Sequence, residues 1–136
     1  MIVYRTSLDG ITASMLTGFF VGWPNPPSPE THLRILAGSY ATVLAIDEEA
    51  AVVVGFVNAI SDGVLSAFIP LLEVLPAYQD NRIGSELIRR LVDLLGDLYA
   101  IDLACDDDVM PFYDRLGFTR GHAMIRRTYS NQAGRP

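Results

Sequence analysis

The chain has 136 residues, of which half are apolar and 19% are charged, and its net charge is −6. This length favours one domain with a real core, and the composition excludes a disordered chain. All ten cations are arginine, and an acidic protein is a poor candidate for binding nucleic acid, whose affinity depends on neutralised phosphates.

The first third of the chain predicts one strand, two short helices and a rigid loop between the helices. Residues 2–8 alternate between apolar and polar side chains and predict a strand, and residues 11–20 suit a short helix. The prolines between 24 and 29 exclude a regular helix or a central strand. Ser28, as an N-cap before a proline, then predicts a helix that ends near Ala37.

The middle of the chain predicts three consecutive strands and a longer helix. Three apolar runs, separated by polar turns, predict strands at residues 40–46, 51–60 and 65–75, and the first two form a hairpin. Residues 83–96 follow as a helix, because apolar side chains recur on one face at helical spacing.

The last third predicts a short strand at 100–104, a short helix at 109–116 and a strand-like segment at 118–129. Antiparallel strands followed by a strand–helix–strand unit indicate a mixed α/β (α+β) fold. We expect a single domain over residues 1–130 and a frayed tail over residues 131–136.

Other classes of site are poorly supported. The single cysteine, Cys105, excludes a disulfide framework and a multi-cysteine zinc site. Asp106, Asp107 and Asp108 do not share a face and have no histidine nearby, so we expect no metal. No signal peptide or spanning apolar run is apparent, which predicts a soluble, cytoplasmic protein with no membrane or nucleic-acid partner.

Residues 71–91 carry most of the functional information. An apolar strand runs into Pro76, a short polar turn follows, and Ile83 opens the helix. The first turn of a helix has backbone N–H groups without partners, and the helix dipole favours negative charge there. This segment therefore predicts an anion site, for which phosphate is the expected ligand; an ordinary strand-to-helix turn is the alternative.

Together with the sequence FYDRLGF at residues 112–118, this segment resembles the GNAT superfamily of acyl-CoA-dependent N-acetyltransferases. The phosphate-binding signature of that family is matched from Gln79 to Gly84, and the aromatic-Tyr-x-x-x-Gly-Phe signature is matched from Phe112 to Phe118. The resemblance implies a central, mixed, mostly antiparallel sheet of six to seven strands with helices on both faces. One position departs from the signature, since Arg82 stands where the family has the first glycine of the turn.

The resemblance also implies where acetyl-CoA binds. Its pyrophosphate would lie on backbone amides of the turn, and its pantetheine arm would follow the strand that precedes the turn. The implied contacts are Leu72, Val74, Leu75, Gln79, Asp80, Asn81, Arg82, Ile83, Gly84, Ser85, Asp106, Phe112 and Tyr113. Asp106 could instead only cap the helix that follows it.

Tyr113 is the predicted general acid. Amine attack on a thioester expels a thiolate, and a phenol with an ordinary pKa near 10 is protonated and able to donate to it. A purely structural aromatic beside Phe112 and Phe118 is the alternative. The predicted base is Glu73, Asp102 or an ordered water between them, although Glu73 could also pair with an arginine or face water.

The predicted reaction is direct acetyl transfer from acetyl-CoA to an unidentified primary amine in a ternary complex. The loop at 23–29 is expected to border the acceptor pocket, which Phe19, Phe20 and Trp23 either wall or merely support as core. His32 is expected to be exposed or partly buried rather than catalytic. A non-catalytic acyl-CoA sensor and a protein lysine or N-terminal acetyltransferase are the alternatives. A homodimer is one assembly that the resemblance allows.

Overall fold

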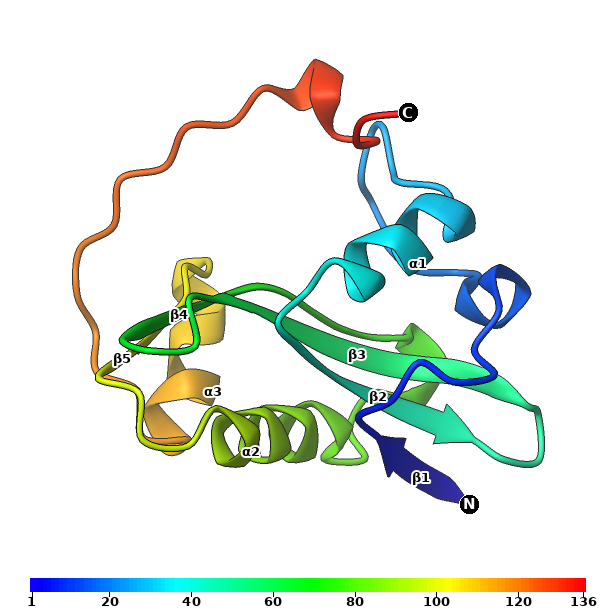
Figure 1. Cartoon of the computed structure of the whole chain (residues 1–136), viewed down its shortest axis with the longest axis horizontal. Helices are drawn as coiled ribbons and strands as arrows, with labels where there is room; N and C mark the ends of the chain where they lie inside the picture. The colour runs from blue at the N-terminus through cyan, green and yellow to red at the C-terminus, as the bar shows by residue number, and fades with distance from the viewer.

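Five strands form a single sheet in the order β1-β2-β3-β4-β5 in the computed structural model, which describes residues 1–136 (Figure 1). The strands are β1 (Ile2–Arg5), β2 (Ala41–Asp47), β3 (Val52–Ser61), β4 (Ser66–Val74) and β5 (Ala100–Asp102). Neighbours from β1 to β4 are antiparallel, and β5 is parallel to β4. The strand–helix–strand connection between β4 and β5 is the feature that turns an antiparallel sheet into a mixed one.

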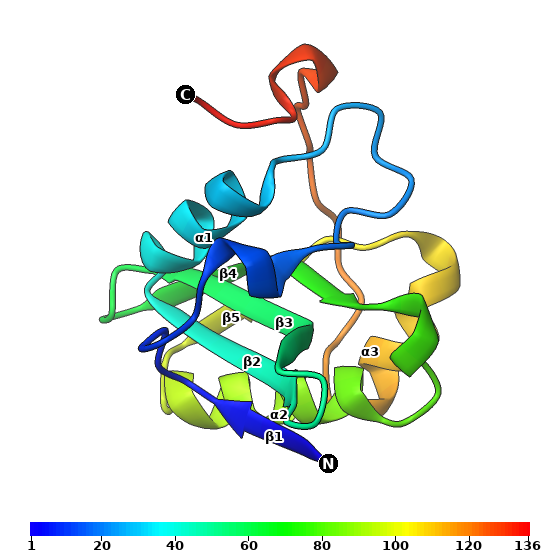
Figure 2. The same ribbon diagram turned by 90° about the vertical axis from the view of Figure 1, so that its right-hand side faces the viewer.

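Helices cover both faces of the sheet, with α1 on one side and α2 on the other (Figure 2). The helices are α1 (Pro29–Ala37), α2 (Ile83–Leu95) and α3 (Met110–Arg115), and the 3₁₀ turns are η1 (Ala13–Leu16), η2 (Pro76–Tyr78), η3 (Asp107–Val109) and η4 (Tyr129–Asn131). α1 begins as predicted, because the Ser28 hydroxyl accepts a hydrogen bond from the Thr31 amide at 3.1 Å. None of the helices has the length and apolarity needed to cross a membrane.

Alternation along β2 and β3 sends apolar side chains to both faces and builds two cores. The core under α2 includes Val43, Val57, Leu87 and Leu91, and the core under α1 and η1 includes Leu16, Leu36, Leu44 and Phe56. Gly55 in β3 lets the start of α2 approach the sheet, since a Cβ there would lie 3.2 Å from side-chain atoms of both Ile83 and Leu87. This close contact fixes the end of α2 that faces the polar turn.

The prediction of six to seven strands is wrong, because the sheet has five. Residues 118–129, predicted as strand-like, are extended, but none of the residues 119–127 makes a backbone hydrogen bond. A strand requires a partner edge as well as a suitable sequence, and no other strand of this chain lies beside this segment.

The helix predicted over residues 11–20 is also shorter than expected. Only η1 forms there, because Thr17 already takes extended geometry with a ψ of 151°, and Gly18 and Phe20 then take positive φ angles of 90° and 63° that no helix contains. The chain then enters the proline-rich loop as irregular backbone, as predicted.

Candidate functional site

The turn between β4 and α2 contains two non-glycine residues in left-handed geometry. Asp80 has a φ of 69°, and Arg82, the N-cap of α2, has a φ of 60° and a ψ of 17°. Arg82 therefore adopts the conformation that glycine reaches most easily, and the turn keeps its course despite the substitution. Both side chains are exposed and make no hydrogen bond or ion pair within the chain.

The first turn of α2 presents uncommitted backbone donors. The amides of Ile83, Gly84 and Ser85 have no hydrogen-bond partner, and the first helical bond runs from the Glu86 amide to the Arg82 carbonyl at 3.1 Å. No side chain caps this end of the helix. Three adjacent N–H groups at the positive end of a thirteen-residue helix are suited to an anion such as a phosphate.

Polar side chains around the turn fix its position. The Tyr78 hydroxyl donates to an Asp47 carboxylate oxygen at 2.6 Å, which joins the turn to the β2–β3 connection and lowers the pKa of Asp47. The Gln79 amide group donates to the Val74 carbonyl at 3.1 Å, and the Asn81 amide group donates to the Tyr78 carbonyl at 3.2 Å. The donors of α2 are thus held in place before any ligand binds.

β4 and β5 pair over a short stretch and then separate. Ser66–Phe68 pair with Ala100–Asp102, whereas β4 continues to Val74 without a partner on that side. Apart from the Val74 carbonyl, which already accepts the Gln79 side chain, the outward backbone groups of this unpaired edge can bond an extended ligand in the manner of an added strand. Leu72, Val74 and Leu75 are half-buried against the core under α2, so it is their main chain that a ligand in the gap would meet.

The two sequence motifs meet in space. A Cβ on Gly84 would lie 3.5 Å from the Phe112 ring and 3.9 Å from a methyl carbon of Val74. The turn at the start of α2, the end of β4 and α3 therefore form one continuous site, although the motifs are about thirty residues apart in sequence.

Tyr113 lies in the core under α2 with 9% of its surface exposed. Its ring meets Phe112 and Phe118 edge-on, at centroid distances of 4.9 and 5.6 Å. Burial, with a smaller effect of the nearby Cys105, raises the pKa of Tyr113 to about 12. The phenol therefore keeps its proton throughout the neutral range.

Glu73 and Asp102 are not brought together. Asp102 pairs with Phe68, five residues before Glu73 on β4, so the backbone positions of the two acidic residues are about 17 Å apart along the strand. Glu73 instead accepts hydrogen bonds from the amides of Phe20 at 2.8 Å and Val21 at 3.2 Å. Glu73 thus fastens the loop after η1 to the end of β4, and Asp102 lies where the two strands are still paired.

The acidic run at 106–108 lies at the start of α3. Asp106 precedes η3 and makes no side-chain capping bond; only its carbonyl accepts a bond, from the Val109 amide at 3.0 Å. No group of three histidine, cysteine or acidic residues in the chain could hold a metal ion.

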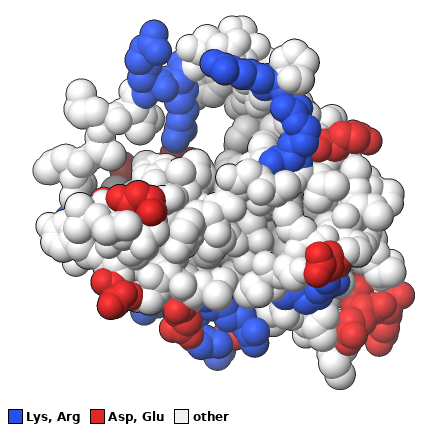
Figure 3. All heavy atoms as spheres, in the orientation of Figure 1, with Lys and Arg blue, Asp and Glu red and all other residues white.

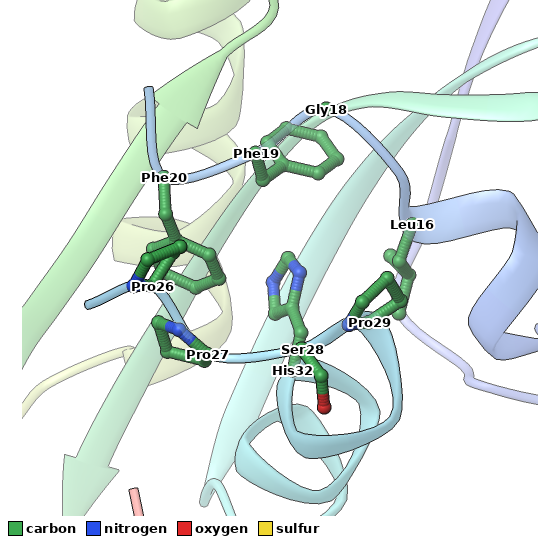
Figure 4. A pocket seen from close by; sticks show the side chains of 9 residues that line it. All are labelled: Leu16, Gly18, Phe19, Phe20, Pro26, Pro27, Ser28, Pro29 and His32. Carbon is green, nitrogen blue, oxygen red and sulfur yellow. The ribbon is translucent and has the colours of Figure 1, made fainter. Parts of the chain in front are cut away.

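A pocket of about 320 Å³ lies between the loop after η1 and the start of α1 (Figure 4). Most of the lining residues are aliphatic, aromatic, glycine or proline, but polar atoms form a large part of the lining surface: Leu16, Gly18, Phe19, Phe20, Pro26, Pro27, Ser28, Pro29 and His32. Trp23 is not part of the lining, although its ring packs on Phe20 at 4.8 Å. Gly18 lines the pocket, and a Cβ on it would lie 3.4 Å from Leu75, the residue directly after β4. The pocket is therefore next to the gap between β4 and β5.

His32 lies deeper in the protein than its sequence predicted. The side chain is fully buried, not superficial, and its ring lies among Phe19, Phe20 and Phe56 at centroid distances of 4.3–5.3 Å. Neither ring nitrogen has a partner in the chain, and burial lowers the pKa of His32 to about 4. The spacing of His32 four residues before Leu36, on the buried face of α1, was the available signal.

The comparison with known families agrees with this geometry. The model of the acetyltransferase (GNAT) family matches residues 8–118, which is most of the chain and includes both motifs. The chain belongs to the GNAT acetyltransferase family. Enzymes of the GNAT family are acyltransferases that generally use acetyl-CoA as co-substrate.

Individual GNAT relatives match to different extents. A crystal structure of a Deinococcus radiodurans R1 protein, assigned as an acetyltransferase, has a TM-score of 0.97 and 56% identity, over 99% of this chain and 94% of that one. The GCN5-related N-acetyltransferase 3, chloroplastic, of Arabidopsis thaliana is 43% identical over 67 residues, which is 48% of this chain and 28% of that protein. An uncharacterised N-acetyltransferase of Pyropia yezoensis is 29% identical over 103 residues, 74% of this chain and 59% of that protein. The matches therefore span less than two thirds of both curated relatives.

Proposed function

We propose that this GNAT protein transfers an acetyl group from acetyl-CoA to the primary amine of a small molecule with an apolar body. One observation supports the proposal: three features lie next to one another. They are the amides without partners at the start of α2, the unpaired edge of β4, and the pocket beside Glu73. The first two suit a phosphate and an extended arm, and the third suits an acceptor.

The residues present fit acetyl-CoA. The amides of Ile83, Gly84 and Ser85 would bond its pyrophosphate, with the exposed Arg82 guanidinium in reach of the same anion. Main-chain groups of β4 between Leu72 and Val74 would bond the pantetheine arm. Asp80, exposed in the same turn, places a carboxylate near the anion and should weaken this binding.

Tyr113 is proposed to protonate the leaving sulfur. In the reaction, the amine nitrogen forms a bond to the acetyl carbon, the carbon–sulfur bond breaks, and the sulfur takes a proton from the phenol, which solvent then restores. The raised pKa of Tyr113 keeps the acid form populated up to about pH 12, but it also makes the phenol a weaker proton donor, because the ideal catalytic pKa lies near the operating pH.

Glu73, rather than Asp102, is proposed to take the proton from the amine. Glu73 touches the backbone of Phe20, which lines the pocket, whereas Asp102 lies at the closed end of the gap. Each Glu73 oxygen accepts one N–H bond and retains a lone pair for a proton.

The pocket supports a small apolar acceptor. Its volume of about 320 Å³ lies at the lower end of the range for ligand pockets. Ser28 is committed to the cap of α1, and both ring nitrogens of His32 are fully buried, so the side chains of the lining offer an acceptor few accessible hydrogen-bonding groups.

A thermal-shift titration with acetyl-CoA, followed by an assay for free thiol, tests the proposal. Acetyl-CoA at 100 times its Kd should stabilise the protein by about 2.7 kcal/mol, and phenethylamine should be acetylated in preference to spermidine or a lysine peptide. Tyr113→Phe should lower kcat by at least about 100-fold and leave the thermal shift unchanged. Absence of any shift with acyl-CoAs would refute the proposal, and a shift without turnover of any amine would favour a sensor.

A further inference from the structure

Phe20 fills part of the pocket beside Glu73 with its own side chain. Only 4% of its surface is exposed, and Figure 4 shows the side chain pointing from the loop into the pocket next to His32. Its ring centroid lies 4.9 Å from that of His32 and 6.2 Å from that of Phe56, and we call these two residues, with Phe19, the aromatic cage. The backbone amide of Phe20 donates to a Glu73 oxygen at 2.8 Å. One residue thus connects the proposed base to the aromatic cage.

The atoms of Phe20 between these two contacts have the skeleton of a 2-arylethylamine. In a phenylalanine residue the backbone nitrogen and the ring are separated by two carbons, Cα and Cβ. In phenethylamine a primary amine and a phenyl ring are separated by the same two carbons. A 2-arylethylamine whose nitrogen took the position of the Phe20 amide beside Glu73 would therefore place its ring in the aromatic cage, where the Phe20 ring now lies.

The segment that contains Phe20 has a glycine on each side. Gly18 has a φ of 90° and Gly22 a φ of 82°, and a Cβ on Gly22 would meet nothing within 4 Å. Phe20 itself has a φ of 63°, in the left-handed region that bulky residues rarely adopt and that indicates strain. A strained residue between two glycines is an arrangement that can rotate away from the pocket, because glycine changes its backbone angles at little steric cost.

Few bonds hold this segment in the pocket. Between residues 17 and 24, hydrogen bonds to the rest of the chain run only from the Phe20 and Val21 amides to Glu73. The Val21 side chain is 60% exposed. An ammonium group offers Glu73 a charged donor in place of these neutral amides, and charge-assisted hydrogen bonds are the stronger kind. A cationic ligand can therefore displace the segment by competing for Glu73.

The charge of the body of the protein also suits a cationic ligand. Residues 1–118, which contain the pocket, have six arginines and sixteen acidic residues, so they carry −10. In Figure 3 many of the blue side chains line the upper rim, where the C-terminal segment runs, and most red side chains lie elsewhere on that face. A negative field of this kind raises the local concentration of cations.

We propose that Phe20 is an internal plug that imitates the acceptor, and that the acceptor is a 2-arylethylamine. On binding, this amine displaces Phe20, places its ammonium group on Glu73 and inserts its ring into the aromatic cage. The inference rests on the proposed function, because it takes Glu73 as the group that meets the amine. It narrows the acceptor from a small amine with an apolar body to an amine of one chain length with an aromatic body.

Binding to the wild-type chain tests the plug without acetyl-CoA and without turnover. Calorimetry compares benzylamine, phenethylamine and 3-phenylpropylamine, which differ only in the number of carbons between nitrogen and ring. Phenethylamine should bind at least about tenfold more tightly than either of the others. Hydrogen exchange in peptides covering residues 17–24 should become faster in its presence, because the Phe20 and Val21 amides lose Glu73.

Three outcomes would overturn the inference: no binding of phenethylamine, equal affinities for the three amines, or binding with unchanged exchange in residues 17–24. Failure of the proposed function looks different. A protein that binds phenethylamine with the expected length preference but does not acetylate it has the plug and the amine site, but not the transferase activity proposed above. A protein that acetylates all three amines equally well has the activity without the plug.

Two matched variants separate the ring of Phe20 from its surroundings. Phe20→Gly removes the competing ring and keeps the left-handed backbone, so it should bind phenethylamine at least about tenfold more tightly than the wild type and melt at a higher temperature when the amine is added. Phe19→Gly removes a neighbouring ring whose amide makes no bond to Glu73, and it should bind no more tightly than the wild type. A folded Phe20→Gly protein that binds phenethylamine more weakly than the wild type would contradict the plug. The wild-type measurements decide the matter if either variant is unfolded.

Discussion

Arg82 and Asp80 form a natural pair for testing the turn, because both are non-glycine residues in left-handed geometry and they carry opposite charges. Glycine at either position relieves a conformation that costs an L-residue roughly 1–2 kcal/mol, although it also adds entropy to the unfolded chain. We therefore expect Arg82→Gly and Asp80→Gly each to raise the free energy of unfolding by up to about 1 kcal/mol in urea titrations.

The same two variants should affect ligand binding in opposite directions. Calorimetry should show acetyl-CoA binding more weakly to Arg82→Gly, which loses a cation, and more tightly to Asp80→Gly, which loses an anion beside the phosphates. Equal shifts in the same direction would mean that backbone flexibility, not charge, governs the affinity.

His32 makes the stability of the protein depend on pH. The folded pKa is about 4 and the unfolded value is near 6.5, so the unfolded state binds a proton first as the pH falls. The neutral His32 stabilises the folded state above pH 6.5, and this stabilisation is lost as the pH falls from 6.5 to 4. The free energy of unfolding should therefore fall by about 2 kcal/mol between pH 7 and pH 5.

Urea unfolding of the wild type at pH 7 and pH 5 measures this loss. The His32→Leu protein, whose leucine cannot titrate, should not show this loss of unfolding free energy. The exposed His122 provides the control, because His122→Gln should show the same loss as the wild type. A His32→Leu protein with the same loss as the wild type would show that other groups are responsible.

At the scale of the elements, two glycines allow α2 to pack closely against its neighbours: Gly55 where α2 meets the sheet, and Gly84 where it meets α3. A Cβ on Gly55 would lie 3.2 Å from Ile83 and Leu87, whereas a Cβ on Gly84 would meet Phe112 at the ordinary distance of 3.5 Å. We expect Gly55→Ala to destabilise the protein by about 1–3 kcal/mol, because it overpacks a filled core.

The matched change Gly84→Ala should stabilise it by about 0.5–1 kcal/mol, because alanine favours the helix and fits the available space. Thermal unfolding of both variants decides the matter. A strongly destabilised Gly84→Ala would mean that α3 cannot move aside by even a small amount.

The helices and strands could be predicted from the sequence wherever the residues that specify them are close together in the chain. The Ser28–Pro29 cap, the apolar face of α2 and the hairpin strands all follow from residues within a few positions of one another, and each is found with shifts of one or two residues. The strand at 118–129 was not found, because pairing depends on a distant edge. The spacing of His32 from Leu36 on α1 indicated its burial, but its aromatic neighbours could not be predicted, since Phe19 and Phe56 come from other elements.

In the molecule as a whole, the proposed site for the acyl donor and the proposed pocket for the acceptor are built from different parts of the chain. The donor side comes from β4, the following turn, α2 and α3, and the pocket comes from the loop after η1 and from α1. The bonds from the Phe20 and Val21 amides to Glu73 link the two directly. A change at Glu73 should therefore affect the acceptor and the chemistry, but not the binding of acetyl-CoA.

Glu73→Gln tests this separation. The amide side chain keeps one oxygen that can accept from Phe20 but presents an NH₂ group to the other amide, and it cannot take a proton from the amine. We expect kcat to fall by about 100-fold or more, the KM of the amine to rise several-fold, and the Kd of acetyl-CoA to stay within twofold. Glu73→Asp, which keeps the charge but is one methylene shorter, should recover part of kcat and little of KM. If Glu73→Gln changed KM alone, Glu73 would be a positioning residue for the loop, and the proton would have to leave through water.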